Sequence, residues 1–460
     1  MGLFLMRDSI DFKNEPVGRI FRKMFLPTLV GMLSMVVLNI TDGAFVGHGV
    51  NSDALAAVNI VAPIFMVMGG VGLMFGIGSS VVASIHLSKD NVHAANLNLT
   101  QGLLISFLIG VAVCIVTTVF QEETCRFFGC SDQLLPLACS YLKWISLMVP
   151  LSMFSSTGMF FIRLDGSPRF AMWLNCISAA LNILLDYLLI FHTSLGLEGA
   201  AIATATAFSI GAFLSLYYML RKTKTVGLAR IKMTKTSLLL SMRNIIYQSK
   251  IGLSALLGEL AIAAVIIVGN YVFMHHLGED GVAAFSVGCY CLPIVFMLGN
   301  AIVGSVQPIL SFAYSQQNTQ RLSAALRLST KIALISGIAG MLGMLFGTDM
   351  ISTVFLQHGC HAQVLCREGL KYFSPAFLVI AINLVLVGYM QSIEAVWPAT
   401  TFTILRGFVF PIPIFIFLPE LIGPEGLWLA MPTAELLTLL AIGGYLRKKG
   451  VHTKATKEKE

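Results

Sequence analysis

The chain has 460 residues, of which 56% are hydrophobic and only 12% are charged, and its mean hydropathy is +0.82. In soluble globular proteins about a quarter of all residues are charged. This composition therefore indicates a polytopic membrane protein in contact with membrane lipids. The net charge of +7 does not indicate a nucleic-acid partner, because the basic residues are confined to loops and tails.

Twelve apolar segments of about 20 residues or more follow one another along the chain, each long enough to cross a bilayer. They lie at 24–46, 54–87, 96–120, 133–162, 170–192, 199–220, 251–274, 282–312, 328–347, 369–391, 399–418 and 427–446. We expect no cleavable signal, because the first 24 residues mix both signs of charge and the first apolar segment is long enough to span.

Lysine and arginine are distributed unequally between the loops. Residues 221–250 contain eight basic residues and no acidic one. The loops expected on the opposite side are acidic, with Asp53, Glu122, Glu123, Glu198, Glu279, Asp280, Glu420 and Glu425. Basic loops face the cytoplasm, so both termini are expected to be cytoplasmic.

The chain repeats itself at an offset of 227 residues. The segment 196–199 (GLEG) recurs at 423–426 (GPEG), and Asn91 recurs as Asn318. An even number of spans in each repeat gives the two halves the same orientation. We expect an all-α protein with twelve transmembrane helices in two pseudo-symmetric six-helix bundles around a central cavity.

The expected organisation follows from the repeat and the charges. It comprises a cytoplasmic N-terminal segment 1–23, a first lobe 24–220, a basic linker 221–250, a second lobe 251–446 and a cytoplasmic tail 447–460. Within the linker, 230–246 is expected to form a helix on the cytoplasmic surface.

Four polar residues of the first half lie inside expected spans. At 1.5 Å per residue, Asp42, Asp186 and Thr204 reach about the same depth, and Asn182 lies one helical turn from Asp186. These oxygen groups suit a proton or a small alkali cation and do not suit a transition metal. Structural alternatives stay open, since Asp42 would also fit an interfacial acid and Asn182 a helix-bridging amide.

Two acids of the second half, Glu259 and Glu435, lie near mid-membrane. Two roles fit each of them: attracting cations from a central cavity, or bridging neighbouring helices. Three basic residues, Lys143, Lys371 and Arg406, are expected to snorkel towards the membrane surface.

These features resemble the multidrug and toxic compound extrusion (MATE) family over essentially the whole chain. The resemblance rests on the acid in the first span, the Asn182-x-x-x-Asp186 pair, the start of the sixth span and Gln307-Pro308 in the eighth.

The resemblance implies a cation site formed by Asp42, Asn182, Asp186 and Thr204, and a bend of the first helix at Pro27. It also implies a substrate cavity that Gln307, Glu259 and Glu435 would border. Members with a second ion site pair acids in the seventh and tenth spans, whereas here the tenth span offers only Glu394 at its cytoplasmic end.

No enzyme motif is present: the sequence lacks a nucleotide-binding loop, a nucleophile elbow and a metal-spaced histidine cluster. The nine cysteines are expected to be mostly free thiols, although the outer-loop pairs Cys125/Cys130 and Cys360/Cys366 could also be oxidised.

The leading interpretation is a Na⁺- or H⁺-coupled antiporter in a bacterial cytoplasmic (inner) membrane, without a cofactor or an obligate protein partner. Its substrates would be organic cations and amphipathic drugs. The alternatives are a lipid-linked saccharide flippase of the same superfamily, and a receptor or channel without coupled turnover. Twelve rather than fourteen spans count against the flippase.

Overall fold

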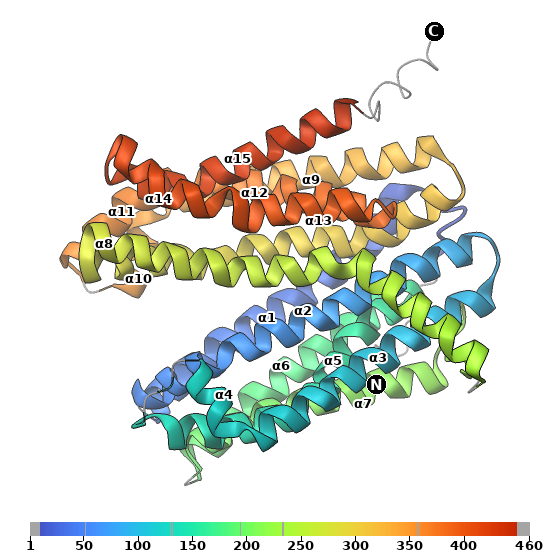
Figure 1. The fold of residues 1–460 in the computed structure, drawn as a ribbon, viewed down its shortest axis with the longest axis horizontal. Coiled ribbons are helices and arrows are strands. Elements are labelled where there is room, and N and C mark those ends of the chain that lie inside the picture. The colour runs from blue at the N-terminus through green and yellow to red at the C-terminus, as the bar shows by residue number, and fades with distance from the viewer. Residues whose placement is uncertain are drawn as a thin grey trace. The chain divides into compact units, whose positions relative to one another are not determined.

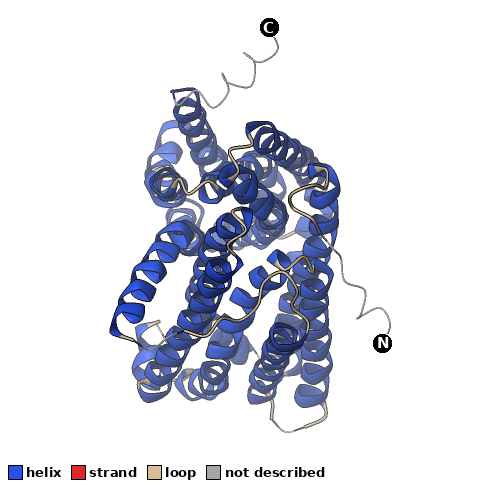
Figure 2. Ribbon diagram, turned by 90° about the vertical axis from the view of Figure 1, so that its right-hand side faces the viewer, coloured by secondary structure: helices blue, strands red, loops and turns tan. Residues whose placement is uncertain are grey.

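The computed structural model describes residues 10–50, 52–128, 130, 132–193, 195–231, 234–356 and 358–448. Within these ranges every regular element is a helix, as expected (Figure 2). The first elements are α1 (Val17–Gly49), α2 (Ser52–Ser88), α3 (Val92–Val119), α4 (Gln121–Phe127), α5 (Leu135–Leu164), α6 (Pro168–Phe191), α7 (Leu197–Arg221) and α8 (Lys235–Ser315). The others are α9 (Thr319–Phe346), α10 (Thr348–Phe355), α11 (His361–Phe373), α12 (Pro375–Ser392), α13 (Val396–Ile404), the π-helical η2 (Leu405–Val409), α14 (Pro411–Ile422) and α15 (Glu425–Lys448).

Eleven helical stretches in the described residues are long and apolar enough to cross a membrane. One of them, α8, has 81 residues and contains two of the expected spans, because the backbone at Gly278 is not helical (φ 64°, ψ −156°). At 1.5 Å per residue, a helix of this length is several times longer than a single crossing requires. The structure is therefore consistent with the expected twelve-span architecture.

The chain forms two compact units, which divide between Leu256 and Leu257. In the first unit α1 packs on α6, α2 packs on α3 and α5, and α7 packs on both α5 and α6 (Figure 1). In the second unit α12 packs on α9 and α15, and α14 packs on α15. The long helices of each unit thus bury one another's apolar side chains.

The sequence repeat is also a repeat of local structure. The Asn91 side chain accepts a hydrogen bond from the N–H three residues later at 3.0 Å and caps α3, and Asn318 caps α9 in the same way at 2.9 Å. Left-handed backbone occurs at two further pairs with the same offset: Asp90/Gln317 and Gly196/Gly423. The two halves therefore begin equivalent helices with equivalent turns.

The basic segment after α7 is tied to the first unit by one buried carboxylate. Asp165, which follows α5, accepts hydrogen bonds from the backbone N–H groups of Thr225 (2.7 Å) and Val226 (3.0 Å). The Tyr218 hydroxyl donates to the same carboxylate at 2.6 Å. Hydrogen bonds to a charged acceptor are the stronger kind, so Asp165 fixes this part of the chain.

The start of α8 also belongs to the first unit. Gln101 on α3 donates to the Ser241 hydroxyl at 2.8 Å, and Gln248 donates to the Asn98 side chain at 2.9 Å. A Cβ atom on Gly78 of α2 would collide with the Gln248 carbonyl, so the two helices touch through their backbones. The helix that the sequence predicts over 230–246 is thus continuous with α8 from Lys235 onward, and residues 232–233 lie outside the described part.

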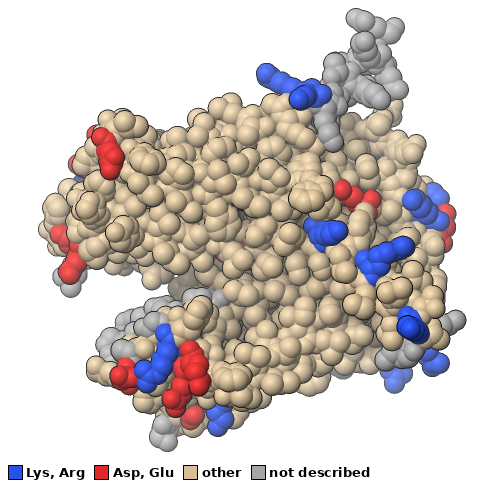
Figure 3. Space-filling model, viewed as in Figure 1, with Lys and Arg blue, Asp and Glu red and all other residues tan. Residues whose placement is uncertain are grey.

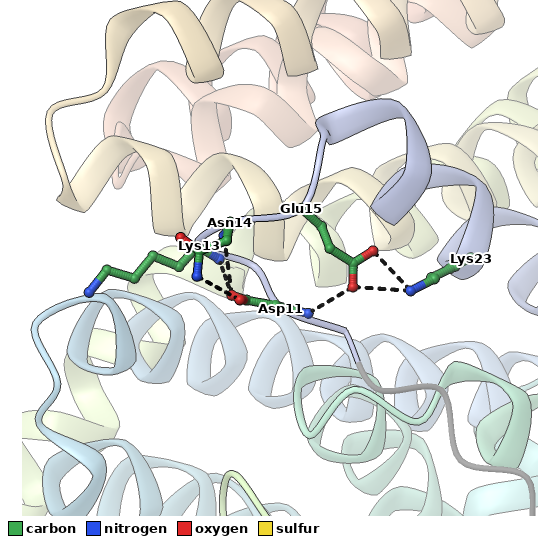
Figure 4. Close-up of polar contacts among 5 residues, drawn as sticks. All are labelled: Asp11, Lys13, Asn14, Glu15 and Lys23. Atoms are coloured by element: carbon green, nitrogen blue, oxygen red, sulfur yellow. Dashed lines mark hydrogen bonds and ion pairs between the residues drawn. The ribbon is translucent and has the colours of Figure 1, made fainter.

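The segment before α1 folds back on itself through two acids (Figure 4). The Asp11 carboxylate accepts from the backbone N–H groups of Lys13 (2.8 Å) and Asn14 (3.2 Å). Glu15 accepts from the Asp11 N–H at 3.2 Å and forms an ion pair with Lys23 of α1 at 2.9 Å. The hydrogen bond that Lys23 donates within this ion pair holds the pKa of Glu15 below its ordinary value.

Much of the outer surface is apolar. On α1 alone Leu26, Leu33 and Ile40 are exposed. The face drawn in Figure 3 is largely uncharged, and its Lys, Arg, Asp and Glu side chains gather towards the ends of the long helices. A helix that contacts lipid chains needs exposed apolar side chains such as these.

Candidate functional site

The four polar residues of the first half come from three helices that touch. Asp42 is on α1, Asn182 and Asp186 are one turn apart on α6, and Thr204 is near the start of α7. Because α6 packs on both α1 and α7, the side chains converge. Asn182 and Asp186 are completely buried (0% exposed) and Thr204 is buried.

Several buried oxygen atoms of this cluster have no hydrogen-bond partner among the described residues. Asn182 Nδ2 donates to Thr204 Oγ1 at 3.1 Å, which fixes the amide so that its oxygen is left over. The carboxyl groups of Asp42 and Asp186 interact directly with each other. Four buried atoms, namely Asp42 Oδ1, Asn182 Oδ1 and both Asp186 oxygens, have no hydrogen-bond donor in the described part of the chain.

Such an arrangement is costly without a further positive charge. A buried polar atom without a partner loses its hydration uncompensated, and two carboxylates in contact repel each other. A proton shared between the acids, or a Na⁺ ion held by carboxylate, amide and hydroxyl oxygens, would remove both costs. Oxygen ligands of this kind are those that hard cations prefer. The residues present therefore fit a proton or a small hard cation.

Tyr141 is a fifth member of the cluster that the sequence analysis did not include. It is buried on α5 and lies close enough to Asp42 and Asp186 to interact electrostatically with both. It follows the start of α5 by six residues, and Thr204 follows the start of α7 by seven. The depth counting that brought Thr204 to the site would have brought Tyr141 there too.

The second unit contains a partly open pocket. Its wall is mainly apolar, with Phe296, Leu292 and Met431 among the lining residues, and it carries two charged side chains, Arg406 and Glu435. All the lining residues belong to this unit.

Arg406 does not snorkel, so the expectation from the sequence is wrong. It is 8% exposed, and its Nε donates to both carboxylate oxygens of Glu435 at 2.7 and 3.0 Å. The reason is its position: α13 begins at Val396, so Arg406 lies ten residues, about 15 Å, along the span, beyond the reach of a side chain to the surface.

Glu435 bridges three elements. It accepts from Arg406 of η2 and from Asn383 of α12, whose Nδ2 is 2.7 Å from Glu435 Oε2, and it is itself on α15. Of the two roles considered for Glu435, the structure shows the bridging contacts directly, and its charge is matched by Arg406.

The remaining expected residues do not join either cluster. Glu259 is half-buried on α8 and has no hydrogen bond or ion pair within the described ranges, and Gln307 is buried. Neither lines the pocket of the second unit. Pro27 is buried inside α1, where it cannot donate to the Lys23 carbonyl and so weakens the helix locally.

The cysteines and the acidic groups do not form a transition-metal centre. All nine cysteines are free thiols, including the two outer-loop pairs. Among the residues that the structure describes, no group of three or more His, Cys, Asp or Glu side chains could hold a metal ion.

The chain is similar to known membrane transport proteins. It is 24% identical over 438 residues to the multidrug export protein MepA of Staphylococcus aureus (strain N315), covering 94% of this chain and 93% of that protein. It is also 24% identical over 448 residues to a FAD transporter of Shewanella oneidensis, covering 95% and 96%. The fold matches an outward-facing multidrug resistance MATE family transporter of the MOP superfamily with a TM-score of 0.88 at 19% identity, over 96% of this chain and 98% of that one.

The family model MatE matches residues 27–188 and again residues 255–416. The second match starts 228 residues after the first, at 255 instead of 27, which agrees with the repeat seen in the sequence and in the helix caps. With both halves matched, the chain belongs to the MatE family and is a multi-pass membrane transporter, not an enzyme.

Proposed function

We propose that this protein is a cation-coupled antiporter that exports organic cations and amphipathic drugs by alternating access. The observation that carries the proposal is the cluster around Asp42 and Asp186, in which four buried oxygens lack a donor and two carboxyl groups touch. Such a cluster gains most from binding H⁺ or Na⁺.

The chemistry of coupling follows from the two charge states of the acids. With a proton or Na⁺ bound, the cluster is close to neutral and can be enclosed by α1, α5, α6 and α7 at low cost. Without it, the acids repel each other and favour a conformation in which water reaches them. Pro27 is the proposed point at which α1 bends between these conformations, because its missing N–H leaves the helix without one hydrogen bond.

The substrate class is proposed from the relatives and from one unpaired acid. The name of the Staphylococcus aureus relative describes multidrug export. In this chain Glu259 has no ion pair among the described residues, so it is the proposed attraction for cations. The 22 methionines and 31 phenylalanines offer adaptable and cation-attracting surfaces for varied shapes.

We further propose that both termini are cytoplasmic. The support is the basic segment 221–250 and the acidic opposite loops. The bacterial relatives support a bacterial inner membrane.

A transport assay tests the proposal. Purified protein in liposomes is supplied with ethidium and with an imposed pH gradient, an imposed Na⁺ gradient, or neither. Ethidium movement driven by one of the gradients and absent without it is the expected result. Solute-for-solute counterflow, which only a carrier performs, separates this function from a channel. Movement that is independent of both gradients would overturn the coupling proposal.

A further inference from the structure

The pocket of the second unit has the composition of a binding site for an amphipathic molecule. Most of its wall is apolar, and the lining includes the charged pair Arg406 and Glu435. Ligand pockets typically combine an apolar lining with a few fixed polar groups that orient the ligand.

The hydrogen-bonding capacity of Arg406 is only partly used. A guanidinium has five N–H donors, and here Nε alone donates to Glu435. Its two terminal amino groups have no partner among the described residues. The Cζ atom of the guanidinium lies over the Phe296 ring, 5.1 Å from its centre. Arg406 is thus held from two sides, while its outer donors remain available.

The surroundings of Arg406 are built to hold it in place. It lies on the π-helical turn η2, and π-helical turns inside α-helices occur frequently at functional sites. A Cβ atom on the next residue, Gly407, would collide with Ala261 of α8, so the backbone is packed tightly there. Asn383 fixes Glu435 from the other side. An ion pair with a purely structural role would have no need for the four remaining N–H donors of Arg406 to stay unpaired at the pocket wall.

We propose that this pocket binds a carboxylate or phosphate group of an amphipathic molecule, which the terminal amino groups of Arg406 hold while Phe296, Leu292 and Met431 cover its apolar part. The planar fork of arginine matches the geometry of these anions. Glu435 competes with the ligand for the same positive charge. The site does not include the acid cluster of the first unit, and the experiment below measures binding rather than transport. The inference can therefore be tested independently of ion coupling.

Binding of flavin mononucleotide and of riboflavin tests the inference, because the two differ only by one phosphate and are both fluorescent. The protein is placed in nanodiscs of phosphatidylcholine, and binding is followed by flavin fluorescence anisotropy. We expect flavin mononucleotide to bind at least about tenfold more tightly than riboflavin, which corresponds to about 1.4 kcal/mol. Equal binding of the two in the wild-type protein would overturn the inference without recourse to any variant.

Variants of the charged pair test whether Arg406 attracts the phosphate and Glu435 opposes it. Glu435→Gln keeps an acceptor for Arg406 Nε and removes the competing charge, so it should tighten binding of the phosphate. The double variant Arg406→Gln/Glu435→Gln keeps a neutral polar pair and should abolish the preference for flavin mononucleotide. Arg367→Gln is the matched control, because it removes an exposed arginine of the same unit and should change nothing.

Repeating the binding measurement in nanodiscs that contain an anionic lipid identifies the source of the anion. With phosphatidylglycerol in the nanodiscs, loss of flavin mononucleotide binding would show that lipid headgroups occupy the pocket, and unchanged binding would show that soluble anions do. A double variant that folds, by its thermal unfolding, and still prefers flavin mononucleotide would contradict the role of Arg406.

Discussion

At the scale of residues, the single hydrogen bond between Asn182 and Thr204 decides where the amide oxygen points. Its donor, Asn182 Nδ2, is 3.1 Å from Thr204 Oγ1. Thr204→Val removes the acceptor but keeps the shape, so the amide is free to rotate. A hydrogen bond of this kind is worth about 1 kcal/mol.

We therefore expect Thr204→Val to weaken apparent affinity for the coupling ion about fivefold, with maximal transport retained. The measurement is the ion concentration that gives half-maximal ethidium export. Thr117→Val serves as control, because Thr117 is a buried threonine of the same unit that donates to Ser146 of another helix, away from the acids. An equal effect in both variants would contradict the specific role of Thr204.

The sequence predicted most of the acid cluster, because straight helices make depth a matter of counting residues. Asp42, Asn182, Asp186 and Thr204 meet as that counting expects. Tyr141 lies at the depth that this counting gives, but it was not predicted, because nothing in the sequence distinguishes it from the many other aromatic residues of the spans. The error at Arg406 has another cause: its partner Glu435 lies 29 residues away on a different helix, and the sequence does not show which helices touch.

At the scale of elements, Asp165 joins α5, α7 and the basic segment. Asp165→Ala leaves the backbone N–H groups of Thr225 and Val226 without their acceptor. Hydrogen bonds to a charged group contribute about 2–3 kcal/mol, so we expect a loss of stability of that order in denaturant unfolding. Hydrogen exchange within 222–231 should increase.

Two further variants make the Asp165 prediction specific. Asp165→Asn keeps one acceptor oxygen and should lose less stability than Asp165→Ala. Asp132→Asn removes an exposed acid paired with Arg126 and should have almost no effect. Equal stability of Asp165→Ala and the wild-type protein would mean that the segment is held by other contacts.

The segment before α1 should respond to pH through Glu15. Lys23 holds the pKa of Glu15 below its ordinary value, which is about 4.3. The stabilisation is therefore fully present above about pH 4.3 and is lost as the pH falls through the lower pKa of the folded state. Because the pair is partly exposed, it is worth at most about 1 kcal/mol.

Hydrogen exchange of residues 11–23, corrected for intrinsic rates, measures this dependence. Protection should fall by up to about fivefold between pH 6 and the acid limit, and Glu15→Gln should show low protection at both ends. The same pH profile in Glu15→Gln and in the wild-type protein would assign the change to another group.

The sequence located the spans well and their joints poorly. The expected segment 170–192 corresponds to Pro168–Phe191, and 427–446 corresponds to Glu425–Lys448. The expected break between 274 and 282 is a single non-helical glycine, Gly278, since residues on either side remain good helix formers. Nor does hydropathy distinguish η2 from an α-helix, because one extra residue in a turn leaves the composition unchanged.

At the scale of the whole molecule, the two halves share a backbone plan but carry different chemistry. In the first half the buried cluster on the fifth and sixth spans holds an amide, a carboxylate and a hydroxyl and includes no basic side chain. In the second half the same pair of spans holds an arginine paired with a glutamate. The repeat thus places polar groups on equivalent spans, and we propose that the residues substituted there decide whether a cation or an anion binds.

Orientation is a prediction of the same scale. In a cysteine-free background, a cysteine introduced at Lys222 or Lys448 should react with a membrane-impermeant reagent only from the cytoplasmic side. A cysteine introduced at Glu279 should react only from outside, because that loop is acidic. Labelling of both kinds from one side would contradict the twelve-span orientation.

The central claim is that Asp42 and Asp186 act as one coupling unit, and gradient-driven export by the Asp42→Asn variant tests it most directly. An amide is cheaper to bury than a carboxylate, so the variant should insert and express normally. It should nevertheless lose export under both a pH and a Na⁺ gradient, because the pair can no longer alternate between charged and neutral states. Asp186→Asn should lose it equally, and the double variant should be little worse than either single one. Normal gradient-driven export by well-expressed Asp42→Asn would contradict the account.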